Sequence, residues 1–319
     1  MRCPSCGNDV SKFDYVCIYC DAVLRREPIE KIPIFRRVDE EWSNPMPRWQ
    51  RFLFVIINPS RAFWDIIHSR KKIGGNLIYL FTALSFGLIG AASFVHIQLP
   101  PFSIDPLLNS LIQFLHTFSV FFQFFLFGLI YYLIFYAIAN KFYKSGANFS
   151  INLKTRLKIR YGEGKKKELA AEEEEAKEGE KKLRAQIEAE GKYVGVLPEY
   201  LTAQKSKKAT IMRLAYMPIV IGLLISALVV LIGLPTVPGS NMRSAVQILS
   251  NSPVWGIIDW IQVIILIGWV PITMSIALRD IANASTQRVY ISCLLISLLL
   301  GLFVYFLRPT LAFSYILSP

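Results

Sequence analysis

Five apolar runs, each long enough to cross a lipid bilayer, constrain this chain more than any other feature of its sequence. A helix rises about 1.5 Å per residue and needs about 20 apolar residues to cross the hydrocarbon core. The five runs cover residues 73–97, 111–139, 214–234, 254–278 and 289–307. Charged residues make up only 18% of the chain, against about 25% in a typical soluble domain. The sequence therefore predicts an all-α polytopic membrane protein and excludes a disordered chain, a disulfide-rich secreted module and a soluble enzyme with one core.

The distribution of positive charge predicts the orientation of these helices. All but two of the 35 Lys and Arg residues lie in segments 1–72, 141–213 and 279–288. The connector 98–110 has no Lys or Arg, and the connector 235–253 has only Arg243. Basic segments resist translocation and stay in the cytosol. We therefore expect a cytosolic N-terminus and a C-terminus outside. The N-terminus has no signal-peptide pattern, so the first span is expected to serve for targeting.

Four cysteines near the N-terminus have the spacing of metal ligands. They read Cys3-Pro-Ser-Cys6 and Cys17-Ile-Tyr-Cys20, and Gly7 allows a tight turn after the first pair. A two-residue gap lets both thiolates of a pair face one ion, and two pairs make a tetrahedral four-sulfur site. We expect a single zinc ion bound by Cys3, Cys6, Cys17 and Cys20. Iron remains an alternative, and disulfides are disfavoured in a reducing cytosol.

The expected zinc site is structural, because four protein ligands leave no open position on the ion. The predicted ribbon, residues 1–24, is too small to fold on a core of its own, so the metal supplies the folding energy. Two interpretations stay open, a folded knob or a docking module for a protein partner. Nucleic-acid binding is not expected, because only Arg2 and Lys12 are basic in this segment. Cys293, inside the fifth span, is interpreted as a packing residue.

The segment between the ribbon and the first span divides into two parts. Residues 25–47 are polar and rich in proline and are predicted to be a linker. Residues 48–72 are predicted to form amphipathic helices in the membrane plane, with Asn58 and Pro59 beginning the second. Anionic lipid would hold them through basic side chains, which are Arg48, Arg51, Arg61, Arg70, Lys71 and Lys72. The alternative is a helix packed on the end of the bundle.

The remaining segments give few functional signals. Asp259 is the one acid well within a span, and an intramembrane carboxylate suggests a transport or proton role. No phosphate-binding loop, nucleophile elbow or His-Glu-x-x-His motif occurs, so we expect no enzymatic activity. Residues 154–208 are predicted to be a charged, largely helical cytosolic insert, because they are rich in Ala, Glu, Lys and Gln.

Three short motifs stand in the order found in one family of five-span membrane proteins. Residues 52–67, with Asn58-Pro59, resemble the segment before that family's first span. The stretch Arg213-Leu-Ala-Tyr216-Met-Pro218 is similar to the entry to its third span, and residues 276–283 resemble its short inner loop. The resemblance, which is to Yip-domain membrane proteins, covers roughly residues 48–310. These include the predicted in-plane helices and most of a five-span domain over residues 73–319. An N-terminal ribbon makes the chain look more like archaeal or bacterial members.

The resemblance implies a function without catalysis. Eukaryotic Yip proteins associate with prenylated Rab GTPases and with one another in vesicle traffic. It therefore implies a membrane scaffold with a cytosolic protein partner, for which a small GTPase is the family's example, and homo- or hetero-oligomers. The membrane would be the plasma membrane in a prokaryote and an endomembrane in a eukaryote. A small-solute transporter or channel, suggested by Asp259, is the alternative.

Overall fold

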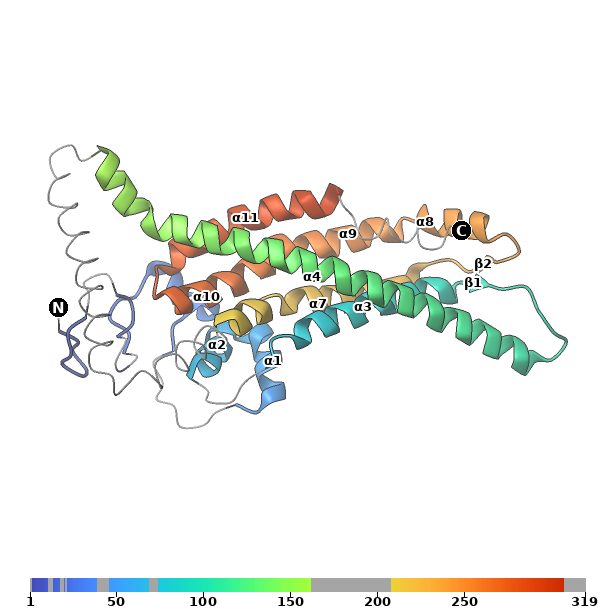
Figure 1. Cartoon of the computed structure of the whole chain (residues 1–319), viewed down its shortest axis with the longest axis horizontal. Helices are drawn as coiled ribbons and strands as arrows, with labels where there is room; N and C mark the ends of the chain where they lie inside the picture. Colours follow the sequence, from blue (N-terminus) through green and yellow to red (C-terminus); the bar gives the residue numbers. More distant parts are fainter. Residues whose placement is uncertain are drawn as a thin grey trace, which may run out of the picture.

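Five membrane-length helices form the body of the molecule. The computed structural model describes residues 2–10, 14–17, 20, 22–38, 46–68, 74–161 and 208–306. Within these residues, the helices that are long and apolar enough to cross a membrane are Leu77–Val95, Pro106–Phe149, Lys208–Gly233, Val254–Ala282 and Thr286–Phe306. They run along one long axis (Figure 1). The prediction of a multi-pass protein with five spanning helices is confirmed at this level.

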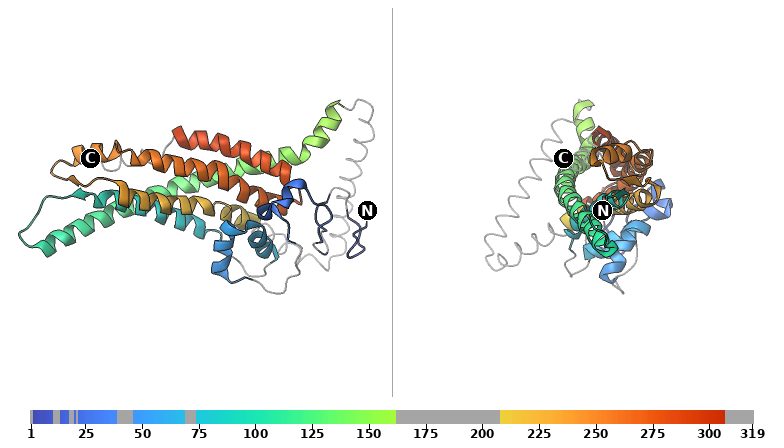
Figure 2. Two further views of the ribbon diagram at one scale, coloured as in Figure 1. Left: turned by 180° about the vertical axis from the view of Figure 1, so that it is seen from behind. Right: turned by 90° about the vertical axis from the view of Figure 1, so that its right-hand side faces the viewer.

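The helix α4 (Pro106–Tyr161) is much longer than the predicted second span. Its 56 residues give a length of about 84 Å, more than twice the thickness of the hydrocarbon core. Figure 1 shows it in green along the whole bundle, and the view down the axis in Figure 2 places it on one side. The helix continues past residue 139 into the predicted insert. The rest of that insert, residues 162–207, lies outside the described residues.

Glycines let α3 (Leu77–Val95) approach α4 closely. A Cβ on Gly87 would lie 2.8 Å from the ring of Phe121, and a Cβ on Gly90 would collide with the ring of Phe124. Small residues in a row allow such close helix contacts. Ala83, Gly87 and Ala91 stand at four-residue spacing in the sequence, but the structure uses Gly90 for the closest approach and leaves Ala91 half-buried.

The remaining helices complete the bundle. The third span ends in α7 (Met217–Gly233), which packs on α3 and α9. The fourth consists of α9 (Val254–Ile264), a π-helical turn η3 (Ile265–Trp269) and α10 (Val270–Ala282). The fifth is α11 (Thr286–Phe306), against α10 and α4. The π-helical turn lies just before Pro271, whose ring would crowd the carbonyl of an ordinary preceding turn.

A short parallel ladder joins the two connectors at the far end of the bundle from α2. Strands β1 (Ile97–Gln98) and β2 (Val237–Pro238) pair there. A Cβ on Gly239 would lie only 2.8 Å from the carbonyl oxygen of Gln98, so this position requires glycine. The same connector contains a helix that was not predicted, α8 (Met242–Ser250), whose first turn is capped by Asn241.

The second of the two helices before the first span, and one basic residue of the first, differ from their prediction. Helix α2 (Pro59–His68) buries Ala62, Phe63 and Ile66, and it packs on α10. This is the alternative in which a helix covers the end of the bundle. Arg51, predicted to contact lipid, is buried and forms an ion pair with Asp65 at 2.5 Å. That assignment was wrong, because a helical pattern does not show which charged side chains find a buried partner.

Helix α1 (Arg48–Ile57) has an exposed apolar stripe. Trp49, Leu53 and Ile57 follow one another at four-residue spacing, and their side chains are 74%, 54% and 63% exposed. The helix runs across the long axis of the bundle (Figure 1). The side chains of Arg48, Arg70, Lys71 and Lys72 lie outside the described part of the chain.

Candidate metal centre

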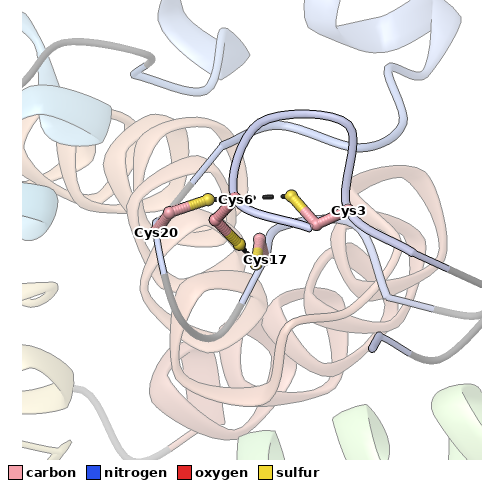
Figure 3. A group of neighbouring side chains, drawn as sticks. All are labelled: Cys3, Cys6, Cys17 and Cys20. Carbon is pink, nitrogen blue, oxygen red and sulfur yellow. Dashed lines mark hydrogen bonds between the residues drawn. The ribbon is translucent and has the colours of Figure 1, made fainter. Parts of the chain in front are cut away.

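The four predicted cysteine ligands converge on one point. All four Sγ atoms lie within 4.8 Å of one another. The Cys3–Cys20 and Cys6–Cys17 sulfur atoms are each 3.7 Å apart, as Figure 3 shows. Two thiolates on a tetrahedral ion with bonds of about 2.3 Å are separated by about 3.8 Å. Disulfide sulfurs would be about 2.05 Å apart. The arrangement therefore fits a metal ion with four sulfur ligands.

Two short turns position the cysteine pairs. In the first, Cys3 N–H donates to the Asn8 carbonyl at 2.8 Å, and Gly7 N–H donates to the Cys3 carbonyl at 2.9 Å. Gly7 has φ of 74°, a left-handed conformation that glycine adopts without a steric penalty, as its place in the sequence predicts. In the second, Cys17 N–H donates to the Ala22 carbonyl at 2.9 Å.

The surroundings of the Cys3 sulfur atom favour its charged, metal-binding form. The backbone N–H of Cys6 is the main cause that lowers the pKa of the Cys3 thiol to about 6. Asn8 Nδ2 donates to Cys6 Sγ at 3.5 Å. Metals bind the thiolate, not the thiol. Cys3 and Cys17 are buried with Val10 in a very small core, which supports the expectation that the metal supplies the folding energy.

The segment predicted as a linker is folded where it is described. It contains two 3₁₀ helices, η1 (Pro28–Lys31) and η2 (Pro33–Phe35), and buries Glu30, Phe35 and Arg37. These short helices lie against the end of the bundle where α10 meets α11, and Figure 1 shows them there in dark blue. Polarity and proline content suggested an open chain. The sequence of this segment does not show the partners of its buried residues, because those partners lie about 250 positions later.

Asn283 attaches the ribbon directly to the connection between α10 and α11. It has φ of 47° and ends α10 in the left-handed conformation that asparagine tolerates. Its Oδ1 accepts hydrogen bonds from Tyr15 N–H at 3.2 Å and Val16 N–H at 2.9 Å. Its Nδ2 donates to the Val16 carbonyl at 2.8 Å. Since Val16 precedes Cys17, this contact reaches the second cysteine pair.

Glu27 caps the start of α11. Its carboxylate accepts hydrogen bonds from Ser285 Oγ at 2.5 Å and from Gln287 N–H at 3.0 Å. The first N–H groups of a helix lack intrahelical partners, and negative charge is favourable there. Glu27 therefore stabilises the start of α11.

Buried charged residues, Glu30, Arg37 and Arg279, form a network next to these contacts. Arg37 Nε donates to Glu30 Oε1 at 2.8 Å, and Arg37 Nη2 donates to the Ala284 carbonyl at 2.6 Å. Thr286 Oγ1 donates to the same Glu30 oxygen at 2.7 Å. Arg279 is fully buried and donates to the Phe35 carbonyl and to Ser60 Oγ. We call Tyr15, Val16, Glu27, Glu30 and Arg37, with Arg279 and residues 283–287, the loop clamp.

The other residues singled out in the sequence lie away from the ribbon. Asp259 lines a crevice between the spanning helices. Cys293 is buried in α11, as expected of a packing residue. Neither belongs to the cysteine cluster, which contains Cys3, Cys6, Cys17 and Cys20. Sequence reasoning missed the loop clamp. The local signal for it is Asn283, five residues after the fourth apolar run ends, because asparagine commonly ends helices.

Comparisons with protein-family models, curated proteins and solved structures give no match to this chain.

Proposed function

We propose that this chain is a non-enzymatic membrane scaffold whose zinc-bound ribbon is a rigid part of the bundle and binds a protein partner in the cytosol. The observation that supports this most is the loop clamp. Asn283 binds the backbone beside Cys17, and Glu27 caps α11. A ribbon on a flexible linker would be an independent knob. A clamped ribbon presents a fixed surface at one end of the membrane helices.

Zinc is the metal that the four-sulfur site favours. Purified protein should contain about one zinc ion per chain, measured by inductively coupled plasma mass spectrometry. The Cys6→Ser variant should lose most of it, because a hydroxyl is a poor substitute for a thiolate ligand. Cys293→Ser, a change outside the cluster, is the control and should retain the zinc. Iron in the intact protein would contradict the assignment to zinc.

The exposed stripe of α1 is proposed to lie at the membrane surface, with the N-terminus inside. An amphipathic helix in the interface buries its apolar face at the level of the headgroups, and Trp is enriched there. The photoreactive residue p-benzoylphenylalanine at Leu53 should crosslink to lipid in native membranes, as detected by mass spectrometry of the adduct. The same residue at Ala22, in the ribbon, should give few lipid adducts. Equal yields at both positions would contradict an in-plane α1.

The resemblance to Yip-domain proteins adds a candidate partner class. Membership of that family is part of the proposal, and it would make a small GTPase the first partner to look for. In the structure, residues that carry the resemblance contact other segments of the same chain. Tyr216 stacks on Tyr136 at 4.3 Å, and Arg279 and Asn283 belong to the loop clamp.

Crosslinking mass spectrometry in native membranes tests the proposal. The intact protein is compared with a Cys3→Ser, Cys6→Ser double variant at matched abundance. A cytosolic partner that is present with the intact protein and lost with the variant is the expected result. Self-crosslinks alone, unchanged in the variant, would contradict a docking role.

Transport is the second candidate function, favoured by the position of Asp259 on the wall of a crevice in the bundle. It predicts solute flux in liposomes that is lost in Asp259→Asn. Absence of flux in the intact protein would remove this candidate.

A further inference from the structure

The crevice lies among the spanning helices. Its walls come from α4, α7, α11 and the stretch from α9 through η3. Its enclosed volume is about 50 Å³, and the open space at its mouth raises the total to about 650 Å³. Ligand pockets commonly measure about 300–1,000 Å³. The enclosed part of the crevice is thus far smaller than such a pocket, so only a slender group can enter it.

Most of the wall is apolar. Side chains from α4, α7 and η3 line it, which are Phe135, Leu223 and Leu266. On α11 the lining includes Gly301, which has no side chain to fill the space. A Cβ on Gly301 would lie 3.4 Å from Ile267, an ordinary contact. An alanine at this position therefore fits without moving a helix.

Polar atoms without partners lie in this wall. Among the described residues, Tyr131 Oη and Gln262 Nε2 are buried atoms with no hydrogen-bond partner. Asp259 stands one turn before Gln262 on α9 and lines the same crevice. An unsatisfied polar group is strongly unfavourable in a hydrocarbon environment, where no water replaces the missing bond. The Tyr131 and Gln262 atoms therefore indicate a bound molecule that supplies an oxygen atom as their hydrogen-bond partner.

We propose that the crevice binds a single-chain amphiphile from the bilayer, whose hydroxyl or carbonyl oxygen lies at Tyr131 and Gln262. Gln262 Nε2 can only donate, so the guest must supply an acceptor, whereas the Tyr131 hydroxyl can donate or accept. Water alone would satisfy the polar atoms but would leave the apolar walls without a partner. A small, mostly apolar crevice within membrane helices suits one hydrocarbon chain, and the bilayer is its direct source.

The probe is a long-chain alcohol with a photoreactive diazirine and an alkyne, added to the full chain in nanodiscs. A matched hydrocarbon probe lacks only the hydroxyl group. Labelled peptides are mapped by mass spectrometry. Gly301→Leu fills the crevice, and Gly268→Leu is its control, because Gly268 is exposed and a Cβ there meets nothing within 4 Å. Tyr131→Phe and Gln262→Leu remove the polar contacts.

We expect the alcohol to label peptides from at least two walls of the crevice. Gly301→Leu should reduce this labelling about tenfold, and Gly268→Leu should leave it unchanged. Tyr131→Phe or Gln262→Leu should weaken competition by unlabelled alcohol about threefold to tenfold, the size expected for one hydrogen bond, without affecting the hydrocarbon probe.

Labelling that persists in Gly301→Leu, or that spreads evenly over the lipid-facing helices, would overturn the proposal. So would equal labelling by the two probes that is insensitive to Tyr131→Phe, since water would then occupy the polar atoms. Size-exclusion profiles show whether each variant folds. If Gly301→Leu fails to fold, Gly301→Ala serves as the smaller change.

Discussion

The Cys17→Ser variant is expected to lose both the fold of the ribbon and the protection of the segment behind it. Binding of zinc to small four-ligand modules contributes about 10–16 kcal/mol, which is folding free energy for a unit without its own core. Cys17 is buried in the ribbon and follows Val16, whose backbone binds Asn283. Removing this ligand should therefore disturb both the metal centre and the loop clamp.

Limited trypsin digestion in detergent measures this effect. In the intact protein, the bond after Arg37 should resist cleavage, because Arg37 is buried against Ala284. In Cys17→Ser it should be cut readily, together with the bonds after Arg25 and Arg26. Cys293→Ala is the matched control. Identical digestion of the Cys17→Ser and control variants would show that the clamp folds without the metal.

Arg37→Met should destabilise the start of α11 by about 3 kcal/mol, because it leaves Glu30 buried without its cationic partner. Glu30 and Arg37 have side chains that are only 3% and 4% exposed. Amide hydrogen exchange of Gln287, which donates to Glu27, should accelerate about a hundredfold. Arg36→Met, an exposed neighbour, should change it little.

The double variant Glu30→Gln, Arg37→Met distinguishes an unpaired charge from a general packing defect. Removing both charges should restore much of the lost stability, since a buried ion pair is often replaceable by neutral groups. If the double variant were as unstable as the sum of the two single variants, the 2.8 Å contact between Glu30 and Arg37 would not be the cause.

The parts of the fold that the sequence predicts are those set by local pattern. A run of about 20 apolar residues usually forms a membrane-spanning helix. Two Cys-x-x-Cys pairs usually bind one metal ion. The spanning helices and the convergence of Cys3, Cys6, Cys17 and Cys20 follow from such patterns. Gly7 in its left-handed turn belongs with them, because its function depends on neighbouring residues alone.

The parts that could not be predicted depend on partners far away in the sequence. Arg51 looks like a lipid-binding residue until its ion pair with Asp65 is seen. Glu27 and Glu30 look like solvated charges in a linker, but their partners are Ser285 and Thr286. The long α4 was shortened in prediction because its apolar part ends well before its helix does.

The shared role of the residues behind the family resemblance was also not visible in sequence. Asn58 caps α2, Tyr216 donates to Asn140, and Asn283 binds the ribbon. Two of these three contacts join segments more than 70 residues apart. Their short motifs therefore mark positions that hold one end of the bundle together.

The most direct test of the account is hydrogen–deuterium exchange of the full chain in nanodiscs, measured with zinc bound and after removal with a chelator. The central claim is that the metal ribbon and the connection between α10 and α11 form one folded unit. It predicts that zinc removal exposes amides of residues 14–24 and, together with them, the amides of Ala284 and Gln287. Exchange that increases in the ribbon alone, with residues 283–290 unchanged, would contradict it.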